Sequence, residues 1–363
     1  MFKSQEDRHG YPTVLRKPTH FACKHHAKPC LFYPGCRRND ALVEHRETSQ
    51  RFQLLDGTWQ FRYYHSIYDL QDPFYAPGCD LADYDTIPVP SVWQNYGYDH
   101  HQYTNIRYPF PADPPYVPKE NPCGAYLYDF DYQQDEVAPR AYLNFEGVAS
   151  CFYVWLNGKF VGYSQVAHST SEFDVTALLQ NGSNHLAVLV LKWCDGSYME
   201  DQDMFRMNGI FRDVYLLCRP EQHIQDYFTT TGILPDRADI RVRLRYRDLA
   251  VATRITIYDA AGTLIGTAAP AANPDDEAFP YCAVIPVPAP ILWNAEQPYL
   301  YTLCWKRPAK PSRIVLASGK FMWQITRFLS TATPSKSTAS TGMNLIPSPV
   351  MPSGWNRPRP TLP

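Results

Sequence analysis

Short hydrophobic runs recur from about residue 50 onward, and residues typical of turns separate them. Three segments between residues 140 and 193 are rich in aromatic and β-branched residues, which favour strands: RAYLNFEGV, CFYVWLNGKFVGYSQ and HLAVLVLKW. Asn157-Gly158 divides the second segment and is a strong signal for a two-residue hairpin turn. The pattern predicts a β-sandwich, whose limits we take as residues 46–219.

A second series of strands follows this first sandwich. Its segments include IQDYFTTTGILPDRADIRVRLRYR, TRITIYDAAGTLIGTAA and YCAVIPVPAPILWNAEQPYLYTLCW, in which RVRLRY and RITIYD alternate cleanly between polar and apolar residues. Strict alternation is typical of strands with one buried face. Residues 220–325 are therefore predicted to form an immunoglobulin-like sandwich.

The two ends of the chain lack such patterns. Residues 1–45 are polar and irregular, and we expect a surface arm there. Its cysteines and histidines fit no recognised zinc spacing; they are Cys23, His25, His26, Cys30 and Cys36. Residues 326–363 are dominated by Ser, Thr and Pro, and such a composition buries too little apolar surface to fold, so this tail is predicted to be disordered.

Composition excludes several classes of protein. The 33 prolines argue against long helices. The formal net charge is −2, with acids and bases interspersed, so we expect no nucleic-acid or membrane partner. No apolar run approaches the roughly 18 residues of a membrane span, and the start has no apolar signal segment. The ten cysteines are scattered without a CxxC pair. A cytoplasmic protein with free thiols is the expectation.

An acidic cluster runs directly into apolar residues in SYMEDQDMFRMNGIFRDV, residues 197–214. Burying an ionised carboxylate is costly unless a partner compensates its charge. For Asp203, the residues alone leave two readings: an ion pair with Arg206 or Arg212 that holds a loop, or a contact with a ligand. Glu200 and Asp201 are open to the same two readings.

Three separated segments carry a resemblance to a known family. They are VPSVWQNYGYDHHQYTNIRYPFPADPPYVPKENPCGAYLYDF (89–130), FEGVASCFYVWLNGKFVGYSQ (145–165) and WCDGSYMEDQDMFRMNGIFRDVYL (193–216). In this order they resemble the amino-terminal, galactose-binding-like jelly roll of the large bacterial β-galactosidases of glycoside hydrolase family 2. The segment ending in LWNAEQPYLYTL looks like the immunoglobulin-like domain that follows it. The resemblance implies retaining hydrolysis of terminal β-D-galactosides such as lactose, in a homo-oligomer.

The resemblance also assigns roles to particular residues. Asp203, the last acid of the EDQD motif, would contact galactosyl hydroxyl groups and help to hold sodium. Asn105, in the YTN motif, would hydrogen-bond the same sugar; without the motif it would be read as a turn residue. Carboxylate and amide oxygens suit both sugar hydroxyls and a hard cation. Asp195 and Gln165 match two ligands of a magnesium site, whose other ligands we could not align.

Three positions depart from the family pattern. Phe205 replaces the usual tryptophan, Asn208 stands where serine or glycine is common, and His168 occupies the place of an arginine. Such changes suggest altered tuning near the site rather than loss of the fold.

The two catalytic glutamates of the family belong to a later (β/α)₈ barrel, so we assign no catalytic residue to this chain and expect it to be inactive alone. The tail offers a reason. Residues 341–347, TGMNLIP, can be encoded by ACC GGC ATG AAT TTG ATC CCG, and reading from one additional preceding A gives NRHEFDP. That string resembles the opening of the family's barrel. We therefore hypothesise a frameshift between about residues 305 and 330.

A non-enzymatic function is the alternative. The chain could act as a free-standing carbohydrate-binding module, with Trp93, Tyr96 and Tyr98 stacking on a sugar, or as a fragment that complements a barrel-bearing partner. The related β-glucuronidases and β-mannosidases share the architecture, but the contexts of YTN and EDQD favour a galactosidase.

Overall fold

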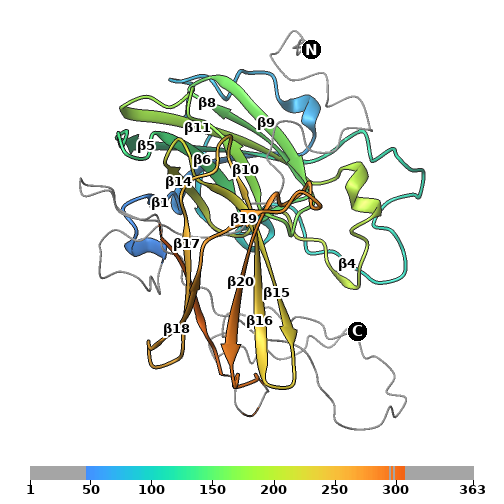
Figure 1. Cartoon of the computed structure of the whole chain (residues 1–363). Coiled ribbons are helices and arrows are strands. Elements are labelled where there is room, and N and C mark those ends of the chain that lie inside the picture. Colours follow the sequence, from blue (N-terminus) through green and yellow to red (C-terminus); the bar gives the residue numbers. More distant parts are fainter. Residues whose placement is uncertain (1–45, 294–295, 297–298, 307–363) are drawn as a thin grey trace. The chain divides into compact units, whose positions relative to one another are not determined.

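The computed structural model describes residues 46–293, 296 and 299–306, and these residues confirm the all-β prediction (Figure 1). Their helices are short 3₁₀ turns: η2 (Arg46–Thr48), η3 (Ile67–Asp69), η4 (Trp93–Tyr96) and η5 (Asp195–Tyr198). The expected amino-terminal arm with its cysteines and histidines, and the expected carboxy-terminal tail, lie outside the described residues.

Two antiparallel sheets form the first sandwich, a jelly roll. One sheet has six strands in the order β3-β2-β5-β11-β8-β9, and the other has four in the order β1-β14-β6-β10. Two-stranded ribbons, β12-β4 and β13-β7, extend from them. The strands are β1 (Phe52–Leu54), β2 (Gly57–Tyr64), β3 (Asp85–Val89), β4 (Tyr103–Thr104), β5 (Cys123–Tyr132), β6 (Arg140–Phe145), β7 (Val148–Ala149), β8 (Cys151–Leu156), β9 (Lys159–Gln165), β10 (Ser171–Asp174), β11 (Gly182–Leu191), β12 (Met204–Phe205), β13 (Gly209–Ile210) and β14 (Val214–Arg219).

The hairpin between β8 and β9 shows why this sequence turns where it does. Asn157 and Gly158 both have positive φ, 53° and 76°, and Leu156 pairs with Lys159 across the turn. A two-residue turn with positive φ at both positions matches the right-handed twist of the strands it joins. Asparagine and glycine adopt this conformation most readily, so the predicted turn is confirmed.

The six-stranded sheet is covered on both of its faces. Its inner face packs against the four-stranded sheet around residues such as Trp59, Val154 and Leu216. Its outer face packs under the segment between β2 and β3, where Phe74 contacts Trp155 edge to face with ring centroids 5.4 Å apart. Every residue of β8 is therefore buried, although a strand with one exposed face would alternate.

The second sandwich packs a four-stranded sheet, β15-β16-β20-β19, against a three-stranded sheet, β18-β17-β21 (Figure 1). Its strands are β15 (Ile224–Ile233), β16 (Arg237–Tyr246), β17 (Arg254–Tyr258), β18 (Leu264–Ala268), β19 (Ala271–Ala272), β20 (Tyr281–Pro288) and β21 (Thr302–Lys306). The predicted alternation in β16 is confirmed, because Ala238, Ile240, Val242 and Leu244 all point into the core. This is the expected immunoglobulin-like sandwich.

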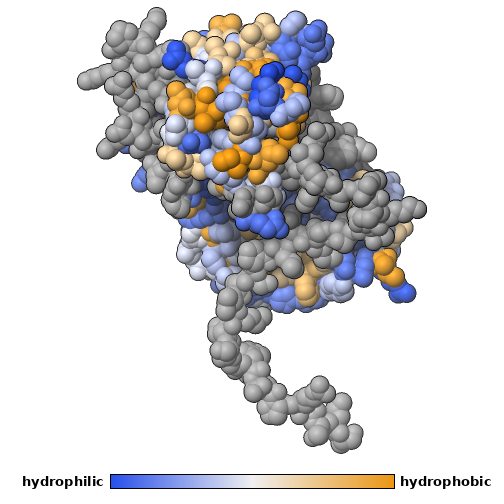
Figure 2. Space-filling model, turned by 60° about the horizontal axis from the view of Figure 1, so that its bottom comes forward, coloured by the Kyte–Doolittle hydropathy of each residue, from blue (hydrophilic) through white to orange (hydrophobic). Residues whose placement is uncertain are grey.

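The surface of the protein carries both hydrophobic and hydrophilic residues. On the face drawn in Figure 2, hydrophobic and hydrophilic residues are interspersed. Several large apolar side chains are nonetheless exposed, including those of Tyr103, Ile106, Met199 and Phe205. Within the described ranges, no helix has the length and apolar character needed to cross a membrane.

Candidate functional site

The ribbon of β4 and β12 brings the two predicted sugar-contact residues together. In its antiparallel register Thr104 pairs with Met204 and Tyr103 pairs with Phe205. Asn105 directly follows β4 and Asp203 directly precedes β12, so the register continued by one residue sets them opposite each other. Both are exposed. They are far apart in sequence, and this short ribbon is what makes them neighbours.

The exposed side of this ribbon, which we call the ribbon face, carries two aromatic rings and the predicted acid. The rings of Tyr103 and Phe205 contact each other edge to face with centroids 5.6 Å apart. The Tyr103 hydroxyl donates a hydrogen bond to Oδ1 of Asp203. This bond raises the pKa of Tyr103 above its usual value, because the phenol proton is held by the carboxylate. The carboxylate thus lies beside exposed aromatic surface.

Arg206 fixes the opposite side of the ribbon. It is buried, and its Nε donates to Oγ1 of Thr104 at 2.7 Å. Its two terminal nitrogens bind the carbonyl oxygens of Glu200 and Gln202, at 3.1 and 2.6 Å, and Nη2 also binds Oδ1 of Asp201 at 2.5 Å. One guanidinium therefore makes three hydrogen bonds to the acidic loop and one to β4, and its planar geometry fixes the positions of these partners.

The three acids of the cluster have different environments. Asp201 pairs with Arg206. Oε1 of Glu200 accepts a hydrogen bond from the backbone N–H of Ala167 at 2.8 Å, and burial raises the pKa of this glutamate. Asp203 receives the Tyr103 hydroxyl instead of an arginine. The first two acids contact the loop or its neighbours, whereas Asp203 is exposed at the surface.

A buried polar ring supports the two segments that enter the ribbon. The backbone N–H of Asn208 donates to Oε1 of Gln94 at 2.9 Å, and Nε2 of Gln94 donates to Oδ1 of Asn208 at 3.0 Å. Nδ2 of Asn208 donates to the carbonyl of Lys192 at 3.1 Å, and Nζ of Lys192 pairs with Asp99 at 2.5 Å. All four side chains are almost fully buried. The ring joins the chain before β4 to the chain after β12.

Sequence reasoning missed most of this ring. Lys192 offered a signal, because a lysine closing the apolar run HLAVLVLKW needs a partner if it is buried. Nothing in the sequence around Gln94 and Asp99 indicates that their side chains are buried and paired. Asn208 was noted only as a departure from the family, and the structure gives it this supporting position.

The other two departures lie in different environments, one packed against a neighbouring ring and one at the surface. His168 contacts the ring of Phe211 with centroids 5.2 Å apart, and burial lowers the pKa of this histidine. Nη1 of Arg212 donates to the carbonyl of His168 at 3.4 Å, so this arginine does not contact Asp203 in the structure. Phe205 lies on the ribbon face. The fold accommodates all three changes.

Asp195 and Gln165, the expected magnesium ligands, also lie near each other. Asp195 begins η5 and Gln165 ends β9. A Cβ placed on Gly196 would lie 3.7 Å from the amide carbon of Gln165. However, Oε1 of Gln165 already accepts the Tyr163 hydroxyl at 2.6 Å. In the part of the chain that the structure describes, no three His, Cys, Asp or Glu side chains group as metal ligands. These two residues alone do not make up the oxygen shell of magnesium.

The three aromatic residues considered as a free-standing stacking platform do not form one. Trp93 is fully buried in the first sandwich, and the hydroxyl of Tyr98 is engaged by Asp85 at 2.7 Å. Tyr96 alone is substantially exposed. The side chain of Trp93 is part of the core.

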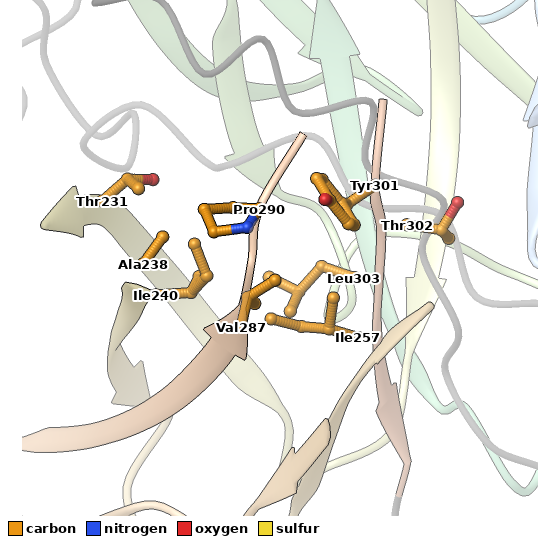
Figure 3. Close-up of a pocket in the computed structure, with 9 residues that line it drawn as sticks. All are labelled: Thr231, Ala238, Ile240, Ile257, Val287, Pro290, Tyr301, Thr302 and Leu303. Atoms are coloured by element: carbon orange, nitrogen blue, oxygen red, sulfur yellow. The ribbon is translucent and has the colours of Figure 1, made fainter. Parts of the chain in front are cut away.

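The second sandwich contains a small apolar cavity between its sheets (Figure 3). Ile240, Ile257, Val287 and Leu303 point toward one another around it, and Tyr301 lies at its edge. Its volume is about 20 Å³, which is close to that of a single water molecule. Ligand pockets are typically about 300–1,000 Å³, so this cavity is a packing void rather than a sugar site.

Comparison with known proteins identifies both sandwiches. Residues 52–220 match the sugar binding domain of the glycosyl hydrolases family 2, and residues 222–307 match a second domain of the same family. The chain is 47% identical over 282 residues to a β-galactosidase of Actinobacillus pleuropneumoniae, and 40% identical over 266 residues to one of Staphylococcus xylosus. These matches include 77% and 73% of this chain.

The chain spans only about a quarter of the length of these curated relatives, 26% and 25% respectively. Among solved structures, it resembles a β-glucuronidase from Ruminococcus gnavus with a TM-score of 0.58 and 16% identity, over 76% of this chain and 45% of the other. A β-glucuronidase from an uncultured Clostridium gives a TM-score of 0.55 and 21% identity, over 75% and 43%. At such identities the likeness shows the fold alone.

Proposed function

The chain belongs to the glycosyl hydrolases family 2, and from this membership we propose that it is the sugar-contacting, amino-terminal part of a β-galactosidase. Asn105 and Asp203 would bind hydroxyl groups of a terminal β-D-galactosyl residue, and Asp203 would also bind sodium. The reaction served is the retaining hydrolysis of β-D-galactosides such as lactose.

The observation that carries this proposal is that Asp203 and Asn105 are both exposed and directly adjoin the paired strands β12 and β4, at the same end of the ribbon. An ionised carboxylate accepts several sugar O–H donors, and an amide both donates and accepts. Asp203 has no arginine partner among the described contacts, because Arg206 binds Asp201 instead. A cation bound at Asp203 would balance its charge, and sodium prefers oxygen ligands in the same way as other hard cations.

The relatives favour a galactoside over a glucuronide. The proteins with 40–47% identity are β-galactosidases, whereas the β-glucuronidase structures share only 16–21%. Substrate preference follows site residues rather than the shared architecture, so the more similar sequences are the better guide.

Four further properties remain predictions. A homo-oligomer and a magnesium site that includes Asp195 and Gln165 rest on the family, whereas a cytoplasmic location and the absence of nucleic-acid and membrane partners rest on the composition of the chain. We also propose that hydrolysis requires a barrel that contributes the two catalytic glutamates. In that case this chain binds galactosides without cleaving them, or complements a barrel-bearing partner.

Binding can be tested directly by titrating the chain with methyl β-D-galactopyranoside, in sodium and in potassium buffers, and measuring heat or saturation-transfer NMR signals. We expect weak binding that is strengthened by sodium. Asp203→Asn should weaken it about tenfold or more and abolish the sodium effect, since a charge-assisted hydrogen bond contributes more than a neutral one.

Asp131→Asn is the matched control, because Asp131 is an exposed carboxylate on β5 of the same sandwich. This variant should bind as the wild type does. The proposal fails if methyl β-D-glucopyranoside binds equally well, or if Asp203→Asn leaves affinity and sodium dependence unchanged.

A further inference from the structure

The second sandwich has a second cavity, which is large enough to hold a ligand. Its volume is about 350 Å³, within the range of about 300–1,000 Å³ that is typical of small-molecule sites. It lies where β16 and β18 end and where β17 and β20 begin. Its walls are the connection between β16 and β17, the connection between β18 and β19, and the side chains of Tyr246 and Tyr281. We call this cavity the edge cleft.

The two connections that wall the edge cleft are more apolar than surface loops usually are. Residues 249–252, between β16 and β17, have the sequence LAVA, and Leu249 is 64% exposed. Residues 268–272, at the end of β18 and through β19, have the sequence AAPAA, and both residues of β19 are exposed. Exposed runs of three or four apolar residues are avoided in folded proteins unless they serve a contact. The edge cleft therefore offers apolar surface to a ligand.

The edge cleft also has a fixed wall and an aromatic pair. The Tyr246 hydroxyl donates to Oγ1 of Thr253 at 2.9 Å, and the Thr253 hydroxyl donates to the carbonyl of Val251 at 2.9 Å. These two bonds tie the connection to β16, so a ligand has little ordering of the wall to bring about. The rings of Tyr246 and Tyr281 meet edge to face with centroids 5.0 Å apart. Aromatic side chains favour edge-to-face and offset contacts with further aromatic rings.

The charged residue that lines the edge cleft is an arginine. Arg254 is exposed, and within the described part of the chain its side chain has neither an ion pair nor a hydrogen bond. The lining residues include no acid, and the nearby carboxylate of Asp248 pairs with Arg247 at 3.6 Å. A guanidinium binds a carboxylate through two parallel hydrogen bonds. Arg254 is therefore free to bind an anionic group of a ligand.

We propose that the edge cleft binds a small aromatic carboxylate, whose ring packs against Tyr246 and Tyr281 and whose carboxylate is held by Arg254. A sugar fits this site less well. The hydroxyl protons of Tyr246 and Thr253 are already donated within the wall, so few polar groups remain for several sugar hydroxyls. A cationic ligand would be repelled by the guanidinium. The inference concerns the second sandwich and does not depend on the proposed function.

Three ligands of nearly the same shape test the chemistry of the site: 2-naphthoate, the uncharged 2-naphthylmethanol and the cationic 2-naphthylmethylamine. Their binding to the full chain is measured by saturation-transfer NMR titration near neutral pH. We expect 2-naphthoate to bind with a dissociation constant of about 0.1–1 mM. The alcohol should bind about fivefold more weakly, the scale of an ion pair near the surface, and the amine more weakly still.

Charge variants test the part played by Arg254. Arg254→Gln should weaken binding of 2-naphthoate about fivefold and leave 2-naphthylmethanol unchanged, a difference that misfolding cannot imitate. Arg254→Lys should keep most of the affinity. Arg241→Gln is the matched control, because Arg241 is an exposed arginine on β16 that does not line the edge cleft. This control should bind both ligands as the wild type does.

Two further measurements test where the ligand lies. Ala250→Trp and Ala269→Trp fill the edge cleft from its two walls, and each should weaken both ligands about tenfold or more, because the added ring takes the space of the ligand. Saturating 2-naphthoate should also slow hydrogen exchange in peptides that include residues 247–254 and 268–272. Circular dichroism verifies that each variant is folded.

Several results would overturn the proposal: equal binding of the three ligands, the same affinity for 2-naphthoate in Arg254→Gln and Arg241→Gln, or wild-type binding by both tryptophan variants. Protection from exchange confined to other peptides would also overturn it, as would a folded chain that binds none of the ligands at millimolar concentrations. The titration with methyl β-D-galactopyranoside tests the proposed function separately, so either proposal can fail while the other stands.

Discussion

Glu200, Asp201 and Asp203 are nearly adjacent in the chain, yet each carboxylate has a different neighbour. Asp201 faces a buried guanidinium, Glu200 accepts a backbone N–H, and Asp203 accepts a phenol at the surface. The sequence indicates that such acids need partners, because charge cannot be buried alone. It cannot assign the partners, since Arg206 was a candidate for Asp203 and pairs instead with Asp201.

Loss of Arg206 should destabilise the first sandwich. Arg206→Met would leave Asp201 buried without its partner and remove donors to two backbone carbonyls. Breaking a buried pair from one side costs roughly 3–5 kcal/mol. We expect a fall of this size in the free energy of unfolding, measured by urea denaturation.

The control for Arg206 is Arg62→Met. Arg62 pairs with Asp83 at 3.2 Å near the surface, and exposed pairs contribute about 0–1 kcal/mol. Equal losses in the two variants would contradict the role given to Arg206.

His223 should make stability depend on pH. Burial, together with the nearby Arg219 charge, lowers its pKa to about 4 in the folded protein, against about 6.5 in the unfolded chain. The unfolded chain therefore gains a proton first as the pH falls. The free energy of unfolding is therefore unaffected by His223 well above pH 6.5. It falls as the pH decreases from 6.5 toward about 4, by about 1–2 kcal/mol at pH 5.

His223→Gln should remove this part of the difference in unfolding free energy between pH 7 and pH 5. His65→Gln, at an exposed histidine, should retain it. The assignment is wrong if both variants keep the wild-type pH dependence.

At the scale of elements, the long strands and their turns could be predicted and the ribbon could not. Asn157-Gly158 and the alternation of β16 are local signals, and both were confirmed. β4 and β12 have two residues each, which is too short for a periodic pattern. Their pairing depends on contacts between distant segments, so only the family resemblance pointed to Asn105 and Asp203 together.

The sequence also did not predict that β8 is buried on both of its faces. Its residues CFYVWL are apolar at every position, which fits a strand covered on both faces but equally a buried helix segment. The cover comes from the segment between β2 and β3, with Phe74 and Tyr75 on Trp155. That segment has little regular structure, and nothing in its own pattern indicates what it covers.

The buried polar ring should limit local opening of the β4–β12 ribbon, although the residues of the ring lie outside β4 and β12. Asn208→Ala removes the side-chain acceptor of Gln94 Nε2 and the side-chain donor to the Lys192 carbonyl, and leaving these buried groups without that partner costs about 1–3 kcal/mol. The backbone bond from residue 208 to Gln94 is retained. We expect faster hydrogen exchange in residues 102–106 and 203–207, since local opening requires less free energy when support is lost. Mass spectrometry of exchanged peptides measures this change.

Gln202→Ala is the control for the ring, because Gln202 is an exposed residue in the same loop. It should leave exchange in both peptides unchanged. If Asn208→Ala accelerates exchange uniformly across the first sandwich, the ring is a general stabiliser and not a support of the ribbon.

At the scale of the whole molecule, the chain spans about a quarter of the length of β-galactosidases that it resembles. We predict that the purified chain does not hydrolyse a chromogenic β-galactoside above the level of a mock purification. The physical reason is that retaining hydrolysis needs two carboxyl groups about 5 Å apart on either side of the glycosidic bond. We assign no such pair here.

The coding DNA provides the complementary test. Reading downstream from the codon of Trp305, a shift of one base should open a continuous frame that encodes a barrel with two glutamates. Absence of a barrel in every frame would contradict the frameshift hypothesis, and activity surviving contaminant controls would contradict the predicted lack of hydrolysis.

The segment between β2 and β3, which covers the outer face of the six-stranded sheet, also shields buried cysteine side chains from reagents in solution. Cys123, Cys151 and Cys194 lie in the layer beneath it. Burial raises the pKa of Cys123, and a hydrogen bond with Cys194 together with burial raises that of Cys151. A protonated, shielded sulfur resists alkylating reagents. Modification of these three sulfurs therefore requires this layer to open locally, so the extent of their alkylation should report how often the segment between β2 and β3 detaches from the sheet.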